Sequence, residues 1–219
     1  MKKIWKRVCT GILALTTILT ALPITSVQAA ETQYWTESAE RVGHVEHLMN
    51  DGTIKSTFNE GHMKVEGETA YCVNINMKFK NGYKTRHNAS ASMSADQIED
   101  VALSIEYMKQ YAGSHSNLSA NQAYLLEQCL VWQRLSEHLG WQCDNVRVVY
   151  SEISQDIQNE VYAGAKSFVK ANKGRYKCGG YIYTGEGQDI GQFWAELNVG
   201  NAKVKKTTTN EIVTNGNAM

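Results

Sequence analysis

The chain has 219 residues, with 22 basic and 22 acidic side chains and 42% hydrophobic residues, which is enough for one domain with a real core. Four of the basic residues and none of the acids lie in the first 30 positions, so 22 minus 4 leaves 18 bases against 22 acids, a net charge of −4. This mildly acidic remainder argues against a nucleic-acid partner and against electrostatic binding to membranes.

The first 30 residues have the three parts of a cleavable signal peptide. A basic start is followed by an apolar run from Val8 to Leu22 and by a small-residue end at 26–30. The apolar run is shorter than the roughly 20 residues that span a bilayer, and threonines interrupt it. We therefore expect cleavage after Ala29 or Ala30 and an exported protein, with no membrane contact beyond the signal peptide.

The N-terminal half of the mature chain has the pattern of β-hairpins. One hairpin is expected from 41–49 and 53–58, because both alternate and Asn50-Asp51-Gly52 between them favours a turn. A second is expected from 70–80 and 83–86, joined at Asn81-Gly82. Cys72 then stands on a strand, on the face opposite its neighbours.

Helical patterns fill the middle of the chain. Two capping-box sequences, at 94–97 and 119–122, each precede apolar residues at helical spacing. A third helix is expected over 151–172, and strands return at 176–183 and 192–199. Strands, then helices, then strands predict an α+β fold, with antiparallel hairpins flanking a three-helix middle segment.

Gln128 lies on the apolar stripe of the second expected helix, where its amide needs a partner. A hydrogen bond to nearby backbone is one way to satisfy it. If Cys72 lies opposite, its thiolate can instead attack the Gln128 carbonyl, expel ammonia and leave an internal thioester. Such a bond lasts only where water is excluded, and the bulky Tyr71 and Trp132 are placed to shield it.

Two motifs resemble those of a known family. Residues 67–73, Gly-Glu-Thr-Ala-Tyr-Cys-Val, resemble the aromatic-Cys-aliphatic motif of the thioester domains at the tips of Gram-positive surface adhesins and pilus-like proteins. Residues 127–132, Glu-Gln-Cys-Leu-Val-Trp, resemble the family's Thr-Gln-x-x-aliphatic-Trp motif, with Glu127 in place of the threonine. The two motifs occur in the family's order, and the resemblance covers about Val42 to Leu197.

The resemblance implies an extracellular adhesin module, secreted or associated with the cell wall, and not an enzyme that turns over. In such a domain a nucleophile on a host or surface protein, usually a lysine amine, opens the thioester and becomes joined to the glutamine. Gln128 would carry the target and Cys72 would be released as a thiol, with no metal or cofactor. Proximity of the bound amine would then supply much of what a catalyst does.

The expected organisation is a signal peptide over 1–30, a thioester domain over 31–199 and the start of a further β-rich domain over 200–219. Residues 203–216 resemble the opening strand and loop of the prealbumin-like repeat domains that commonly follow such a tip. We therefore expect the chain to be a truncated part of a surface protein whose repeats follow this segment.

Four cysteines follow the signal peptide, and in an exported protein the default interpretation is two disulfides. Cys72 with Cys129 is an available pair, although adjacent helical residues point about 100° apart, so Cys129 should face away if Gln128 faces Cys72. Cys143 and Cys178 flank the third expected helix and form a possible disulfide. Both pairings stay open at this point.

Two other functional classes also stay open. A cysteine hydrolase or transglutaminase-like enzyme would need a histidine base for Cys72, for which His62, His87 and His115 are the candidates. Its nucleophile, however, is expected at a helix N-terminus, where the pKa falls, and not on a strand. The remaining class is a noncovalent adhesin or pilin subunit with the same fold and no thioester.

Overall fold

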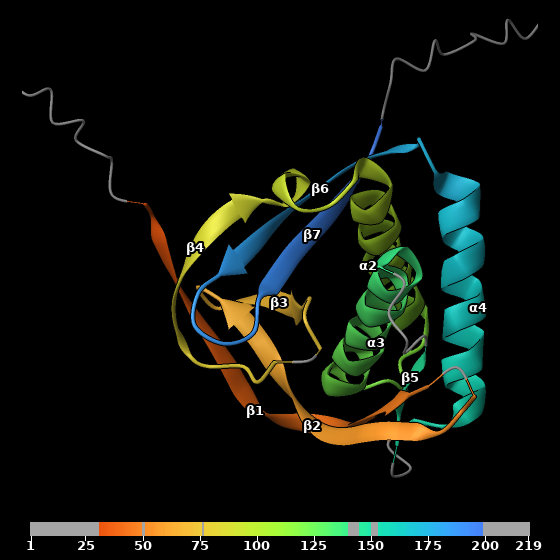
Figure 1. The fold of residues 1–219 in the computed structure, drawn as a ribbon. Coiled ribbons are helices and arrows are strands. Elements are labelled where there is room, and N and C mark those ends of the chain that lie inside the picture. Colours follow the sequence, from red (N-terminus) through yellow and green to blue (C-terminus); the bar gives the residue numbers. More distant parts are fainter. Residues whose placement is uncertain (1–30, 50, 76, 140–144, 150–152, 199–219) are drawn as a thin grey trace, which may run out of the picture. The chain divides into compact units, whose positions relative to one another are not determined.

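The computed structural model describes residues 31–49, 51–75, 77–139, 145–149 and 153–198 (Figure 1). The expected signal peptide, Cys143 and the expected β-rich start at 200–219 lie outside these ranges. The chain divides into two units, Met1–Thr32 and Gln33–Met219, and every described helix and strand belongs to the second. The described part of this unit contains three α-helices and antiparallel strands, which confirms the α+β class. None of the described helices has the length and apolar character of a membrane span.

The strands form one antiparallel sheet whose order is β2-β3-β7-β6-β4-β1-β5. Because β1 also pairs with β2, the first six strands in this order close into a ring, and β5 extends it along the C-terminal half of β1. The strands are β1 (Gln33–Leu48), β2 (Ile54–Val65), β3 (Glu68–Cys72), β4 (Gly82–Asn88), β5 (Asn145–Val148), β6 (Tyr176–Thr184) and β7 (Ile190–Leu197).

The first expected hairpin is confirmed as β1 and β2, both longer than expected, whereas the second is wrong. β3 ends at Cys72 and forms its hairpin with β2, through a two-residue turn at Glu66 and Gly67. Both turn residues have positive φ, 50° and 84°, which suits the twist of a tight hairpin. The other edge of β3 pairs with β7, so β4 pairs with β1 and β6 instead.

The helices are η1 (Ala89–Ala91), α2 (Ala95–Ser114), α3 (Ala120–Leu139) and α4 (Gln155–Asn172). Both expected capping boxes are present: the backbone N–H of Gln97 donates to Ser94 Oγ at 3.3 Å, and that of Gln122 donates to Ser119 Oγ at 3.2 Å. The third helix begins later than expected, because Ser154 caps it by accepting from the N–H of Ile157.

Two helices lie between the sheet and α4 (Figure 1). α2 packs against β6 and β7, α3 packs against β1, β3 and β5, and α4 covers both helices from outside. Buried side chains form two clusters, one containing Cys72, Trp132 and Ile190, and the other containing Tyr71 and Phe193. Cys72 and Tyr71 thus face opposite sides of β3, as the alternation of a strand predicts.

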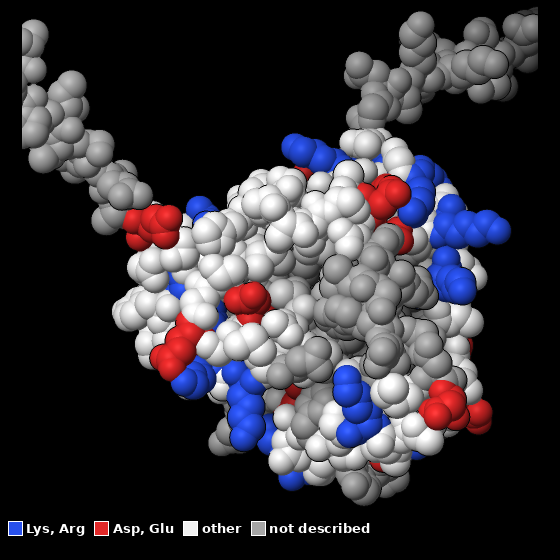
Figure 2. Space-filling model, in the orientation of Figure 1, with Lys and Arg blue, Asp and Glu red and all other residues white. Residues whose placement is uncertain are grey.

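Charged side chains on the face seen in Figure 2 are of both signs. Acidic and basic side chains are interspersed over its left and lower parts, and several basic side chains lie together at the upper right, over the upper part of α4.

Candidate functional site

Cys72 and Gln128 meet where β3 ends against α3. The backbone N–H of Cys72 donates to Gln128 Oε1 at 2.7 Å, and Gln128 Nε2 donates to the carbonyl oxygen of Cys72 at 3.0 Å. Both residues are completely buried. The residues that the sequence predicted to form a pair therefore lie in direct contact, with the carboxamide held against the backbone of the cysteine.

The end of a strand ladder explains this contact. Pairing between β2 and β3 stops at Met63 and Ala70, so on that edge no described strand supplies a partner for the N–H and carbonyl of Cys72. Buried backbone groups need such partners. The side chain of Gln128 takes the place of the missing strand.

Tyr124 stands one helical turn before Gln128 and ties the same region together. Its hydroxyl donates to the carbonyl of Ala70 at 3.2 Å and accepts from the backbone N–H of Met63 at 3.1 Å. The hydroxyl also lies 3.5 Å from Gln128 Oε1. α3 is thus bonded to both β2 and β3 beside the candidate site.

The thiol of Cys72 lies in an apolar, low-dielectric environment. Burial raises its pKa well above the ordinary value, and the negative charge of Glu60 raises it further, while the Trp132 indole and the Asn74 backbone act in the opposite direction as hydrogen-bond donors. The thiol is therefore protonated at neutral pH. Because only the thiolate is strongly nucleophilic, reaction with Gln128 requires a group that accepts the proton.

The two residues expected to shield the site occupy different positions. Trp132 is 2% exposed and packs in the same cluster as Cys72. Tyr71 is 4% exposed but belongs to the other cluster, and its hydroxyl donates to the Glu127 carboxylate at 2.8 Å. Trp132 therefore covers the sulfur directly, whereas Tyr71 seals the opposite side of β3.

The cysteines do not form the disulfide that the sequence allowed at Cys72. Cys72 and Cys129 are both free and buried. Cys129 faces α4, where it interacts with Tyr162, and burial raises its pKa to about 12. Cys178 is also free, and Cys143 lies outside the described residues, so the structure gives no support to a Cys143–Cys178 disulfide.

The three candidate histidine bases make their contacts elsewhere. His62 stacks on Tyr124 and is bonded to Thr69, His87 is bonded to Thr184, and His115 stacks on Tyr111. None of these contacts involves Cys72. Among the described residues, no group of three or more His, Cys, Asp or Glu side chains is arranged to hold a metal ion.

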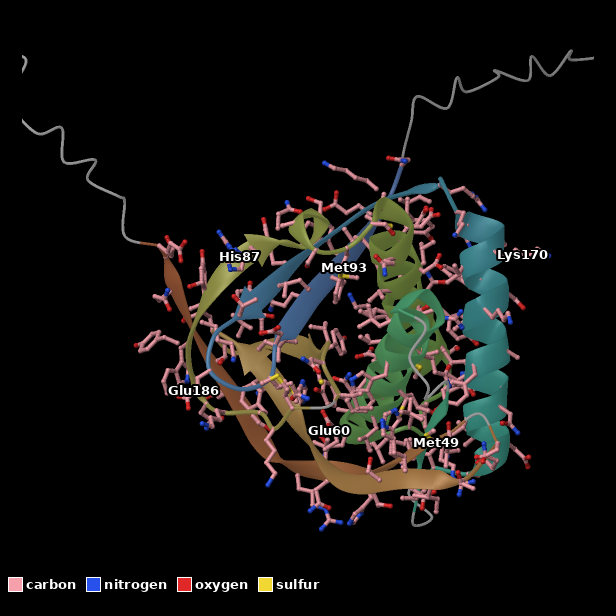
Figure 3. All side chains as sticks on the ribbon, viewed as in Figure 1. Met49, Glu60, His87, Met93, Lys170 and Glu186 are labelled. Atoms are coloured by element: carbon pink, nitrogen blue, oxygen red, sulfur yellow. The ribbon has the colours of Figure 1, made fainter. Side chains whose placement is uncertain are left out.

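Glu60 on β2 is a site residue that the sequence analysis missed. It is 4% exposed, and burial raises its pKa to about 8. Its negative charge raises the pKa of Cys72, Tyr124 and Cys129, so the carboxyl lies near these groups around the candidate site. Figure 3 shows Glu60 on the inner side of β2, toward α3. A glutamate on an alternating strand gives no sequence signal that distinguishes it from a solvated one.

Comparisons with known proteins add one distant structural likeness. No protein-family model matches the chain, and a search of curated proteins finds no match. Among solved structures, the chain is similar to the thioester domain of the Staphylococcus aureus TIE protein. The TM-score is 0.43 and the identity 11%, over 76% of this chain and 98% of that one. A likeness at this distance assigns no activity, so the functional argument rests on the contacts described above.

Proposed function

We propose that this chain is a secreted or cell-surface adhesin module in which Cys72 and Gln128 form an internal thioester that binds its target covalently. The observation that carries the proposal is the pair of hydrogen bonds by which the backbone of Cys72 holds the buried carboxamide of Gln128. The same residue thus supplies both the nucleophile and the groups that orient the carbonyl it attacks. The export signal read in residues 1–30 supports an extracellular location.

Formation of the thioester needs no external reagent. The sulfur of Cys72 adds to Gln128 Cδ, the thiol proton is transferred to the carboxamide nitrogen, and the C–N bond breaks to release ammonia. The N–H of Cys72, already bonded to Oε1 at 2.7 Å, stabilises the negative charge that develops on this oxygen. Burial under Trp132 keeps water from hydrolysing the product.

Capture of the target reverses this chemistry with a different amine. A lysine amine of a host or surface protein adds to Cδ, the C–S bond breaks, and the target is joined to Gln128 by an amide while Cys72 regains its thiol. The noncovalent contacts need only hold the amine near the carbonyl. Each molecule reacts once, which distinguishes the module from an enzyme.

A noncovalent binding module is the second candidate, and one observation favours it. Gln158 on α4 makes the same contacts with Val148 on β5: the N–H of Val148 donates to Oε1 at 2.9 Å, and Nε2 donates to the carbonyl at 2.9 Å. No thiol takes part there. Gln158 therefore shows that a buried glutamine in this fold can have a purely structural role, which is to hold a strand against a helix. In this alternative Gln128 has the same structural role.

Intact-mass measurement of the mature protein separates the two candidates. A thioester makes the chain lighter by one ammonia, and treatment with methylamine then adds one methylamine. Cys72→Ala and Gln128→Ala should each abolish the deficit. Gln158→Ala is the matched control, because it removes an equivalent pair of hydrogen bonds between a glutamine carboxamide and a strand backbone, and it should leave the ammonia deficit in place. An unmodified mass with a free Cys72 thiol would favour the noncovalent module.

A further inference from the structure

A pocket of about 570 Å³ lies beside the candidate site, between β2, the connection from β3 to β4 and the turn before β7. We call it the Glu60 pocket. Its lining includes the polar side chains of Glu60, Gln188 and Asn59 and the apolar side chains of Met63, Ile75 and Phe79. The pocket therefore combines an apolar wall with a few hydrogen-bonding groups, as small-molecule and side-chain sites commonly do.

Two acceptor atoms in this pocket are buried without a partner. Glu60 is 4% exposed and Gln188 is 5% exposed, yet Glu60 Oε1 and Gln188 Oε1 have no hydrogen bond among the described residues. Gln188 is oriented by its other atoms, since Nε2 donates to the carbonyl of Asn74 at 2.9 Å and its N–H donates to that of Lys78 at 3.1 Å. Unsatisfied buried acceptors are costly, so this arrangement calls for a ligand that donates hydrogen bonds.

A primary ammonium group matches these features. It offers three donors and a positive charge, which suits one carboxylate oxygen and one amide oxygen. The methylene stem of a lysine or another aliphatic amine would lie along Met63, Ile75 and Phe79, since long amines bury their stems against apolar surface.

Cys72 and Gln128 do not line the Glu60 pocket themselves, but two of its lining residues are linked to Cys72. Gln188 precedes Asp189, whose carbonyl accepts from the N–H of Val73, and the next residue, Ile190, pairs with Cys72. On the other side, the charge of Glu60 acts on Cys72. An amine that enters this pocket would therefore approach the buried bond from the side of Glu60.

We propose that the Glu60 pocket is the entry site for the target amine, and that Glu60 binds the ammonium group and takes its proton. This inference rests on the proposed thioester, since it assigns the amine-binding residue of that site. Gln188 is a positioning residue, which holds the nitrogen but takes no part in the bond changes.

The proton movements balance within this arrangement. An ammonium group gives one proton to the Glu60 carboxylate and becomes a neutral amine. The amine nitrogen adds to Gln128 Cδ, and its second proton goes to the departing Cys72 sulfur as the C–S bond breaks. Glu60 then releases its proton to solvent. Departure of ammonia during thioester formation is the same path in reverse, with ammonia as the smallest amine.

The titratable neighbours of Glu60 set the pH dependence. Cys72 faces it from β3, Tyr124 and Cys129 face it from α3, and Lys78 lines the pocket from the connection to β4. Burial raises the pKa of the three neighbours on β3 and α3, so all of them are uncharged at neutral pH. Of Glu60 and these three neighbours, Glu60 is the one whose charge changes near pH 8, where its pKa lies.

The test compares wild type with Glu60→Gln, Gln188→Met and Glu186→Gln. Glu186 is the matched control because its carboxylate is exposed and pairs with Lys80, and Figure 3 shows it away from Glu60. The ammonia deficit of each variant is measured first, and then the rate at which n-butylamine adds across a range of pH. Loss of a general base lowers rates by about 10²-fold or more, and loss of one hydrogen bond by about tenfold.

For wild type, the rate should rise with pH to about 8 and then level off, because it needs both the Glu60 carboxylate and the ammonium form of the amine. For Glu60→Gln this plateau should be absent, and the rate should increase with the concentration of free amine alone. Glu186→Gln should behave as wild type.

A folded Glu60→Gln that fails to form the thioester also supports the proposal, and Gln188→Met then supplies the rate comparison. Wild-type rates in both pocket variants would overturn it and leave the thioester standing. A wild type without the ammonia deficit would overturn the proposed function, and the pocket assignment with it.

Discussion

The hydroxyl of Tyr71 donates a 2.8 Å hydrogen bond to the carboxylate of Glu127, one residue before the Cys72–Gln128 contact on both elements. Each contact joins residues 56 apart in sequence. Two adjacent residues of β3 are thus matched to two adjacent residues of α3, which fixes how the helix lies against the strand. Glu127 serves this alignment through its carboxylate.

Removing the Tyr71 hydroxyl tests the alignment. Tyr71→Phe leaves the partly buried carboxylate of Glu127 without this donor, and we expect it to lower the free energy of unfolding by about 1 kcal/mol. Urea denaturation measures this loss. Tyr83→Phe is the control, because Tyr83 is 67% exposed and should change stability little. Equal stability of the two variants would show that the Tyr71–Glu127 bond does not hold the helix.

Gln128 and Gln158 make equivalent hydrogen bonds to strand backbone, but only Gln128 is expected to react. Gln128→Ala and Gln158→Ala each leave buried backbone groups unpaired, on Cys72 and Val148, and should each destabilise the fold by about 1–3 kcal/mol. Similar losses on thermal unfolding are the expected result, with the ammonia deficit absent only from Gln128→Ala. If the deficit vanished from both variants, its loss would reflect damage to the fold and not removal of the reacting carbonyl.

Trp132 should control the lifetime of the thioester. Trp132→Phe keeps an aromatic ring but opens space over Cys72, so water reaches the bond and hydrolysis should become faster. The measurement is the growth of the hydrolysed mass, with Gln128 converted to glutamate, during incubation at neutral pH. Trp194→Phe is the control on β7, and equal hydrolysis rates in the two variants would remove Trp132 from the shielding role.

Glu60 makes the stability of the fold depend on pH. Its pKa is raised from 4.5 to about 8, so the folded state holds the proton more tightly than the unfolded chain does. The contribution of Glu60 to the free energy of unfolding is therefore fully present below pH 4.5. As the pH rises toward 8, this contribution decreases by on the order of a few kcal/mol. Glu60→Gln should lack this part of the decline. Parallel pH–stability curves for the variant and wild type would contradict a buried, titrating Glu60.

Sequence patterns predicted the helices better than the pairing of the strands. The capping boxes at Ser94 and Ser119 mark their helices correctly because a cap is a local interaction over three residues. The pairing of β3 depends on β7, which lies more than 100 residues away and has no local signal. The strong Asn81-Gly82 signal therefore predicted a hairpin that the structure does not form.

The candidate site was also predictable only where it depends on local sequence patterns. Gln128 and Trp132 share a helix face, so the polar residue on an apolar stripe was visible in the sequence. That Gln128 would bond to the backbone of Cys72 was not, because this depends on where the β2–β3 ladder stops. Burial of Glu60 likewise depends on the packing of elements that are distant in sequence, so the local sequence pattern does not indicate it.

Peptide mapping of the purified protein tests the central claim most directly. The protein is digested without reductant at mildly acidic pH, where thioesters hydrolyse slowly, and the fragments are weighed. A covalent bond predicts one species that joins the fragment containing Cys72 to the fragment containing Gln128, lighter than their sum by one ammonia. Two separate fragments of unmodified mass, with a Cys72 thiol that alkylates freely after unfolding, would contradict it.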